Sequence, residues 1–180
     1  MPSAGNELLF NLIITIMKKL FLLLTAAICV ASSAFAQTPI KYQGEVDLGY
    51  SLGVGEFATG RVNIQTIHGA MIGQYFSAGI GLGVDIYHEG GTDVVVPIFL
   101  NLKGYLPTNS KITPYASFDI GAGIGVSEYV SGLSGVMLTP AIGIKAGMFK
   151  AQLGFNVQKF SESGISIGFN AVQLKVGVVF

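Results

Sequence analysis

An all-β fold is predicted for this chain of 180 residues: an eight-stranded antiparallel up-and-down transmembrane β-barrel, preceded by a signal peptide. Three observations predict it. Apolar and polar residues alternate with a period of two along most of the chain after residue 40, as in strands with one wet and one dry face. Charged residues make up only 11%, whereas a soluble domain has about 25%. A basic and then apolar segment near the start is typical of an export signal.

The export signal occupies residues 17–36. Met17-Lys18-Lys19 supplies the positive start, Leu20–Val30 is the apolar region, and Ala34-Phe35-Ala36 fits a cleavage site. Cleavage after Ala36 is therefore expected. It leaves a domain of residues 37–180, which has no apolar run of the length that a membrane-spanning helix needs.

The residues upstream of this signal, 1–16, are interpreted as an extension, because translation from Met17 gives a complete signal peptide. The alternative is a membrane anchor that joins this segment to the apolar region. It would place Lys18 and Lys19 near the middle of the span, at a cost of several kcal/mol. The single cysteine, Cys29, lies in the apolar region, and Ile28 before it is too large for a lipoprotein signal.

The eight expected strands are recognised by their apolar faces. These faces run over 42–52, 62–66, 76–86, 96–102, 112–126, 136–148, 151–157 and 172–180. The expected turns are rich in Gly, Asn, Ser and Pro and lie at 53–60, 68–73, 88–93, 107–110, 129–135, 149–150 and 160–164. The domain is thus predicted to be a meander of antiparallel strands.

The chemistry of the two faces favours a membrane. The apolar faces carry almost no charge, and the opposite faces are mostly Gly, Ser, Gln and Asn with one or two charges per strand. A soluble barrel would place many more charges outside. Unpaired strand edges are too costly in lipid, so the sheet must close. Tyr42, Tyr50 and Phe180 suit the aromatic girdles at the two interfaces.

Three segments carry a family resemblance: Val96–Tyr105, Thr113–Gly121 and Thr139–Lys145, together with a last strand that ends in Phe180. On these segments the chain resembles the small bacterial outer-membrane β-barrel proteins with the architecture of the OmpA-like transmembrane domain. The resemblance implies a barrel in the outer membrane and supplies no catalytic residues. It also implies that Phe180 is a signal read by the barrel-assembly machinery.

The charges of the polar faces are expected to point into the lumen, the interior of the barrel. They are Lys41, Glu45, Asp47, Arg61, Asp85, Lys103, Asp119, Lys145 and Lys175. The lumen of eight strands is just wide enough to be filled by side chains, and buried charges must pair. We therefore expect a salt-bridged, plugged interior, to which Tyr75, Phe99, Tyr115 and Phe149 also contribute. The alternative is a narrow ion path.

Catalytic chemistry finds little support. His68 is expected in a periplasmic turn and His88 in an outer loop, at opposite ends of the barrel. A triad near His88 would take one of the serines 127, 131 and 134 and one of the acids Glu89 and Asp93. The acids Asp85, Glu89 and Asp93 are also a conceivable Ca²⁺ site, although a solvated loop explains them as well. The Gly-rich runs at 79–83 and 121–125 have a strict period of two, so they are strand faces and not phosphate loops.

The leading interpretation is a non-enzymatic outer-membrane barrel with a structural or surface-interaction role. The alternatives are a narrow passive, porin-like channel, a lipid-modifying outer-membrane enzyme, and a soluble lipocalin-like carrier, which the uncharged faces disfavour. Outer-membrane lipid is the expected partner of a monomer. No cofactor or metal is predicted, and the net charge of zero gives no basis for nucleic-acid binding.

Overall fold

The structure is a computed structural model that describes residues 39–55, 58–88, 93–127, 134–162 and 165–180, together with Lys19. The predicted extension and signal peptide therefore lie outside the described residues. A compact unit spans Ile40–Phe180. Among the described residues, no helix is long and apolar enough to cross a membrane.

Eight strands form this unit. They are β1 (Ile40–Val54), β2 (Arg61–Ile72), β3 (Phe76–Tyr87), β4 (Asp93–Tyr105), β5 (Ile112–Gly125), β6 (Ser134–Ala146), β7 (Phe149–Glu162) and β8 (Ile165–Val179). Each has 12 to 15 residues, about twice the usual strand length of soluble proteins.

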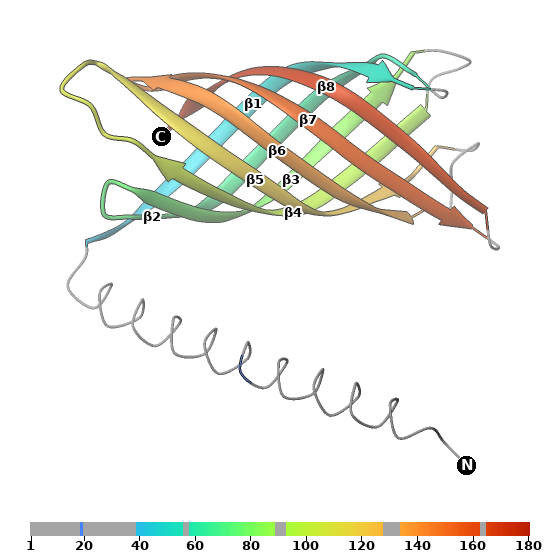
Figure 1. Ribbon diagram of the computed structural model, residues 1–180, viewed down its shortest axis with the longest axis horizontal. Helices are drawn as coiled ribbons and strands as arrows, with labels where there is room; N and C mark the ends of the chain where they lie inside the picture. The colour runs from blue at the N-terminus through green and yellow to red at the C-terminus, as the bar shows by residue number, and fades with distance from the viewer. Residues whose placement is uncertain (1–18, 20–38, 56–57, 89–92, 128–133, 163–164) are drawn as a thin grey trace, which may run out of the picture. The chain divides into compact units, whose positions relative to one another are not determined.

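The strands close into an antiparallel barrel in chain order (Figure 1). β1 completes the ring by pairing with β8, from Glu45 opposite Val179 to Val54 opposite Asn170. Gly44 and Phe180 add two backbone hydrogen bonds of 2.7 and 2.9 Å at the end of this seam. The predicted fold class, an eight-stranded up-and-down barrel, is confirmed.

The barrel has two distinct ends. We call the end with Ile40, Phe180 and the turns at 73–75, 106–111 and 147–148 the terminal end. The other, with the connections between β1 and β2, β3 and β4, β5 and β6, and β7 and β8, is the loop end. Gly147, with φ at +61°, is the first residue of the two-residue turn between β6 and β7. A positive φ at that position favours glycine in a tight hairpin.

The interior of the barrel is polar and its outer surface apolar. Along β3, for example, Ile80 and Leu82 are 66% and 50% exposed, whereas Ser77 and Asp85 on the other face are buried. Among the described residues, polar side chains outnumber apolar ones in the interior. This arrangement follows directly from the alternation in the sequence, because successive residues of a strand point to opposite faces.

Several strands extend further than the apolar pattern predicts; β8, for example, begins at Ile165 rather than near residue 172. Two of these extensions bring His68 and Lys150 into the sheet. β2 continues to Ile72, so His68 lies in a strand opposite Gly44 and Ile80 rather than in a turn. β7 begins at Phe149, which brings Lys150 into the sheet opposite Lys145 and Gly177. In both cases backbone pairing continues beyond the predicted strand.

Candidate functional site

The lumen holds the densest cluster of functional groups among the described residues. Its buried acids are Glu45, Asp47, Asp85 and Asp119, and its buried bases are Arg61, Lys103, Lys150 and Lys175. Each of these side chains is at most 5% exposed. The lumen charge network therefore contains four acidic and four basic groups, so the buried charge sums to zero when all are ionised.

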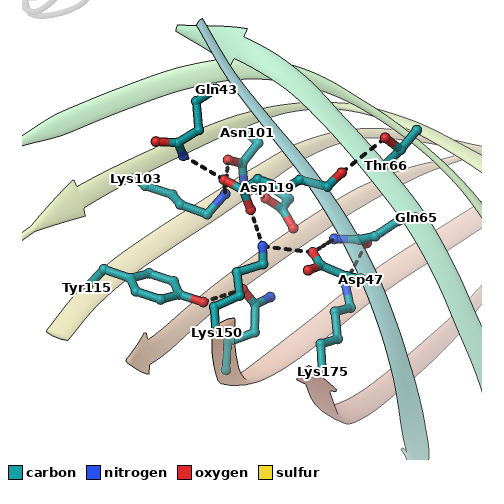
Figure 2. A network of polar contacts seen from close by, with 12 residues as sticks. Gln43, Asp47, Gln65, Thr66, Asn101, Lys103, Tyr115, Asp119, Lys150 and Lys175 are labelled. Carbon is teal, nitrogen blue, oxygen red and sulfur yellow. Dashed lines mark hydrogen bonds and ion pairs between the residues drawn. The ribbon is translucent and has the colours of Figure 1, made fainter. Parts of the chain in front are cut away.

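Glu45 on β1 is the centre of the network. Figure 2 labels its partners Gln43, Lys103 and Lys150. Its Oε1 accepts hydrogen bonds of 2.8 Å from Lys103 Nζ and 2.8 Å from Gln43 Nε2. Its Oε2 accepts one from Lys150 Nζ. Lys150 also donates to Asp47 Oδ2 over 2.9 Å. Two lysines from β4 and β7 thus neutralise two carboxylates that β1 places two residues apart.

Amide side chains extend this network around the ring. Gln65 Nε2 donates to Asp47 Oδ2 over 2.9 Å, and its Oε1 accepts from Lys175 Nζ over 2.8 Å. On the other side Asn101 accepts from Lys103 over 2.5 Å and donates to Asp119. Amides donate with one end and accept with the other. They therefore connect charges that the barrel wall holds too far apart for direct contact.

A second cluster lies nearer the loop end, around Arg61. Its guanidinium donates to Tyr87 Oη over 2.8 Å and to Asn156 Oδ1 over 2.5 Å, and its Nε lies 3.4 Å from Asp85 Oδ2. Asn63 donates to Asp85 Oδ1 over 2.6 Å. The other members of this cluster are neutral polar groups. The charges of Arg61 and Asp85 therefore cancel within the cluster.

Apolar side chains occupy part of the lumen too. Ile67, Phe99 and Met137 form a buried cluster contributed by β2, β4 and β6. Phe99 requires Gly81 opposite it, because a Cβ at that position would lie 2.2 Å from the Phe99 ring. A hollow beside Glu45, Ile67 and Asn101 has a volume of about 10 Å³, which is room for about one water molecule.

Four residues predicted to fill the lumen do not. Lys41 is exposed, and Lys145 is half-buried with its Nζ 5.9 Å from the centroid of the Tyr105 ring. Tyr75 and Phe149 are 61% and 65% exposed. All four lie at the terminal end. Lys41 and Lys145 have inward parity, but the lumen opens there and no longer buries them. Phe149 precedes the inward Lys150 and therefore faces outward, and Tyr75 lies in the turn before β3.

Lys150 is the lumen residue that the sequence prediction missed, because it was assigned to a turn. The signal was present: Gln152, Gly154 and Asn156 are the inward residues of β7, and Lys150 continues their even-numbered series. Extending the alternation by one step would have placed it inside.

The outer surface carries a second polar group, around His68. Its Nδ1 lies 2.6 Å from Tyr42 Oη, and its Nε2 lies 2.9 Å from Thr66 Oγ1. The Tyr42 and His68 rings stack with centroids 6.2 Å apart. A hydroxyl, an imidazole and a second hydroxyl in a row have the order of a nucleophile, a general base and an orienting group.

The directions of the hydrogen bonds among these groups argue against a catalytic role. Thr66 Oγ1 donates its only proton to the carbonyl oxygen of Glu45 over 3.0 Å. His68 Nε2 must then donate to Thr66, and no lone pair on that nitrogen faces the hydroxyl. In this arrangement His68 does not accept a proton from Thr66, and the three groups satisfy one another on a mostly apolar surface.

His88 does not join the triad considered from the sequence. Its ring stacks on Tyr50 with centroids 6.3 Å apart, and no hydrogen bond among the described residues links it to Ser127 or Asp93. Those two bond each other over 2.9 Å, while Ser134 is exposed at the start of β6. Glu89 and residue 131 lie outside the described residues.

A calcium site is not assembled by the described members of the acidic set. Asp85 is directed into the lumen toward Arg61 and Asn63, and Asp93 bonds Ser127. Among the residues that the structure describes, no group of three or more His, Cys, Asp or Glu side chains is placed to hold a metal ion.

Solved structures include barrels similar to this one, although no family model and no curated protein matches the chain. Neisserial surface protein A (NspA) has a TM-score of 0.60 at 10% identity, covering 78% of this chain and 97% of that one. The N-terminal β-barrel domain of Pseudomonas aeruginosa OprF has a TM-score of 0.50 at 15% identity, covering 79% and 100%. The outer membrane enzyme PagL has a TM-score of 0.54 at 11% identity, covering 74% and 98%.

Proposed function

We propose that this chain is a non-enzymatic outer-membrane β-barrel protein with a structural or surface-interaction role. The observation that carries the proposal is the lumen charge network, which fills the barrel and balances its own charge. A protein that needed an open bore would leave a continuous space there. The fold is shared with a Neisserial surface protein and with an outer membrane enzyme, as their names state.

The outer surface supports insertion in a bilayer. On β1, the apolar residues Val46 and Leu48 lie between Tyr42 and Tyr50, each of which stacks on a histidine. Eight residues at about 3.3 Å, tilted by about 40°, give a band about 20 Å high. This is close to the height of about 25 Å typical of outer-membrane barrels, with amphipathic rings at both edges.

The topology follows from export and from the even number of strands. An export signal delivers the chain to the periplasm, so the terminal end faces the periplasm and the loop end faces outward. We propose cleavage after Ala36, which N-terminal sequencing of the exported protein tests directly. A start at another residue would contradict this site without affecting the barrel.

A passive channel is the first alternative. It requires a continuous water path, whereas the hollow beside Glu45 and Ile67 has only about 10 Å³. Opening a path would also require separating buried ion pairs such as Lys103 with Glu45, at a cost of several kcal/mol.

A lipid-modifying enzyme is the second alternative, favoured by the Thr66, His68 and Tyr42 row on the outer surface. The proton of Thr66 is already given to the backbone, so we expect no hydrolysis. Purified protein mixed with phospholipid or lipopolysaccharide in detergent micelles should release no fatty acid. Release that is lost in His68→Ala but kept in His88→Ala would establish the enzyme.

Partners follow from the same proposal. Outer-membrane lipid surrounds a monomeric barrel. The barrel-assembly machinery recognises the last strand, in which Phe180 lies over Gly44 at the seam. Replacing Phe180 by Ala should slow assembly in cells more than refolding in vesicles, because only the former needs recognition.

Cell fractionation with gel electrophoresis tests the proposed location. We expect the protein in the outer-membrane fraction, with a faster band before heating than after, as a closed barrel gives. Recovery of a folded monomer from the soluble periplasmic fraction would contradict the proposal and favour the lipocalin-like carrier.

A further inference from the structure

The lipid-facing wall of β5 to β8 is hollowed near the terminal end. Two shallow apolar hollows of about 560 Å³ each lie there and share Ala116, Ile142 and Leu153 in their linings. They therefore form one continuous depression, which we call the trough. Its remaining apolar walls include Leu106, Ile144, Leu174, Phe155 and Val172.

Small residues opposite large ones cause the trough. Across β5, β6 and β7 the row Pro114, Ile144 and Ala151 lies beside the row Ala116, Ile142 and Leu153. Pro114, Ala116 and Ala151 do not fill the space that the longer side chains enclose. The hollow is thus a consequence of side-chain size on a regular barrel wall and involves no break in the sheet.

The trough fits within one leaflet. Along β5 it runs from Pro114 to Ser117, and along β7 from Ala151 to Phe155. The four residue steps of β7, tilted by about 40°, span about 10 Å of depth, which is less than half of the roughly 30 Å hydrocarbon core of a bilayer. It begins at the terminal end, so it lies along the leaflet that meets that end.

The charged side chains at this end are all lysines. Lys111 is exposed in the turn before β5, and Lys41 is exposed at the start of β1. Lys145 is half-buried on the lumen side of β6, with its Nζ 5.9 Å from the centroid of the Tyr105 ring. The acids of this half, Glu45, Asp47 and Asp119, are buried in the lumen and bonded there. Among the described residues, the terminal rim therefore carries lysines without exposed acidic side chains.

We propose that the trough and this rim bind one acidic phospholipid of the leaflet at the terminal end. An acyl chain lies in the trough and the phosphate group lies at Lys111, in the turn that also holds the trough residue Leu106. Apolar lining suits a hydrocarbon chain, and each basic residue near a membrane surface favours an anionic headgroup. The inference rests on the proposed insertion in the membrane and adds a lipid class and a position.

Native mass spectrometry of the folded barrel in detergent tests the site. Phosphatidylglycerol and phosphatidylcholine with identical acyl chains are titrated separately. We expect one phosphatidylglycerol retained more tightly than phosphatidylcholine. Lys111→Gln should weaken it about fivefold. Lys145→Gln, on the lumen side of β6 near Tyr105, and Lys159→Gln, exposed on β7 near the loop end, should leave it unchanged.

A second pair of variants tests whether the trough holds the acyl chain. Ala116→Leu fills the trough and should weaken both lipids by the same factor. Ala122→Leu, also exposed on β5 but outside the trough, is the matched control. Gel mobility before heating shows that each variant is folded.

The outcomes separate the two proposals. Equal retention of both lipids by the unmodified protein, or equal effects of Lys111→Gln and Lys159→Gln, would overturn the lipid site and leave the membrane barrel intact. A dimer that disappears in Ala116→Leu would assign the trough to a second copy of the chain. A chain that never inserts into vesicles would contradict the proposed function itself.

Discussion

Replacing Lys150 by Met should destabilise the barrel strongly. Lys150 bonds both Glu45 and Asp47 in the lumen, and its removal leaves three buried carboxylates with two lysines in that half. Removing one partner of a buried ion pair costs about 3–5 kcal/mol, because the remaining charge has no compensation. We expect a loss in that range in the free energy of unfolding.

Lys145→Met is the matched control. Lys145 lies opposite Lys150 in the strand register but is half-buried at the rim, near the Tyr105 ring. An ion or ring contact that solvent reaches contributes about 1 kcal/mol or less. The two substitutions remove the same chemical group from neighbouring strands. The difference between their losses in the free energy of unfolding therefore measures what burial in the network contributes.

Urea titration of the protein folded in lipid vesicles provides the assay. The chain contains no Trp, so the folded fraction is measured by gel mobility before heating and by circular dichroism. Combining Lys150→Met with Asp47→Asn restores charge balance and should recover about 1–3 kcal/mol. Equal losses for Lys150→Met and Lys145→Met, or no recovery in the double variant, would refute the network as described.

Two further substitutions test facing and packing. Leu100→Arg, on the outer surface, should cost about 2–4 kcal/mol in vesicles, and Leu100→Ala much less; similar values for both would show that this face does not meet lipid. Gly81→Val should cost about 1–3 kcal/mol, since a Cβ there meets the Phe99 ring. The same urea titration should show that adding Phe99→Ala relieves part of this loss, and an unrelieved loss would place Phe99 elsewhere.

The fold was predictable because alternation sets both the strands and their facing. The buried positions Glu45, Asp47, Lys103 and Asp119 follow from a period of two alone, with no knowledge of contacts. The periodicity of two does not give depth along the barrel axis. Lys145 has the inward parity of a lumen residue but lies at the rim, where water reaches it.

Strand ends were the main source of error. β2 continues past Thr66 because its backbone pairs with β1 and β3 on both sides, even though His68 faces outward among apolar residues. Thr66 is two residues from His68 on the same face of β2, so this contact is local. The contact between His68 and Tyr42 depends on the pairing of β1 with β2. No local pattern around His68 contains Tyr42, so the complete polar row on the outer surface could not be predicted.

Planar-bilayer recording of the purified protein tests the filled lumen most directly. The lumen charge network and the Phe99 cluster predict no steady conductance at moderate voltage, because eight strands leave no bore once these side chains are in place. Reproducible single-channel steps that are abolished by bulky substitution at Gly81 or Gly123 would contradict this account and identify the barrel as a channel.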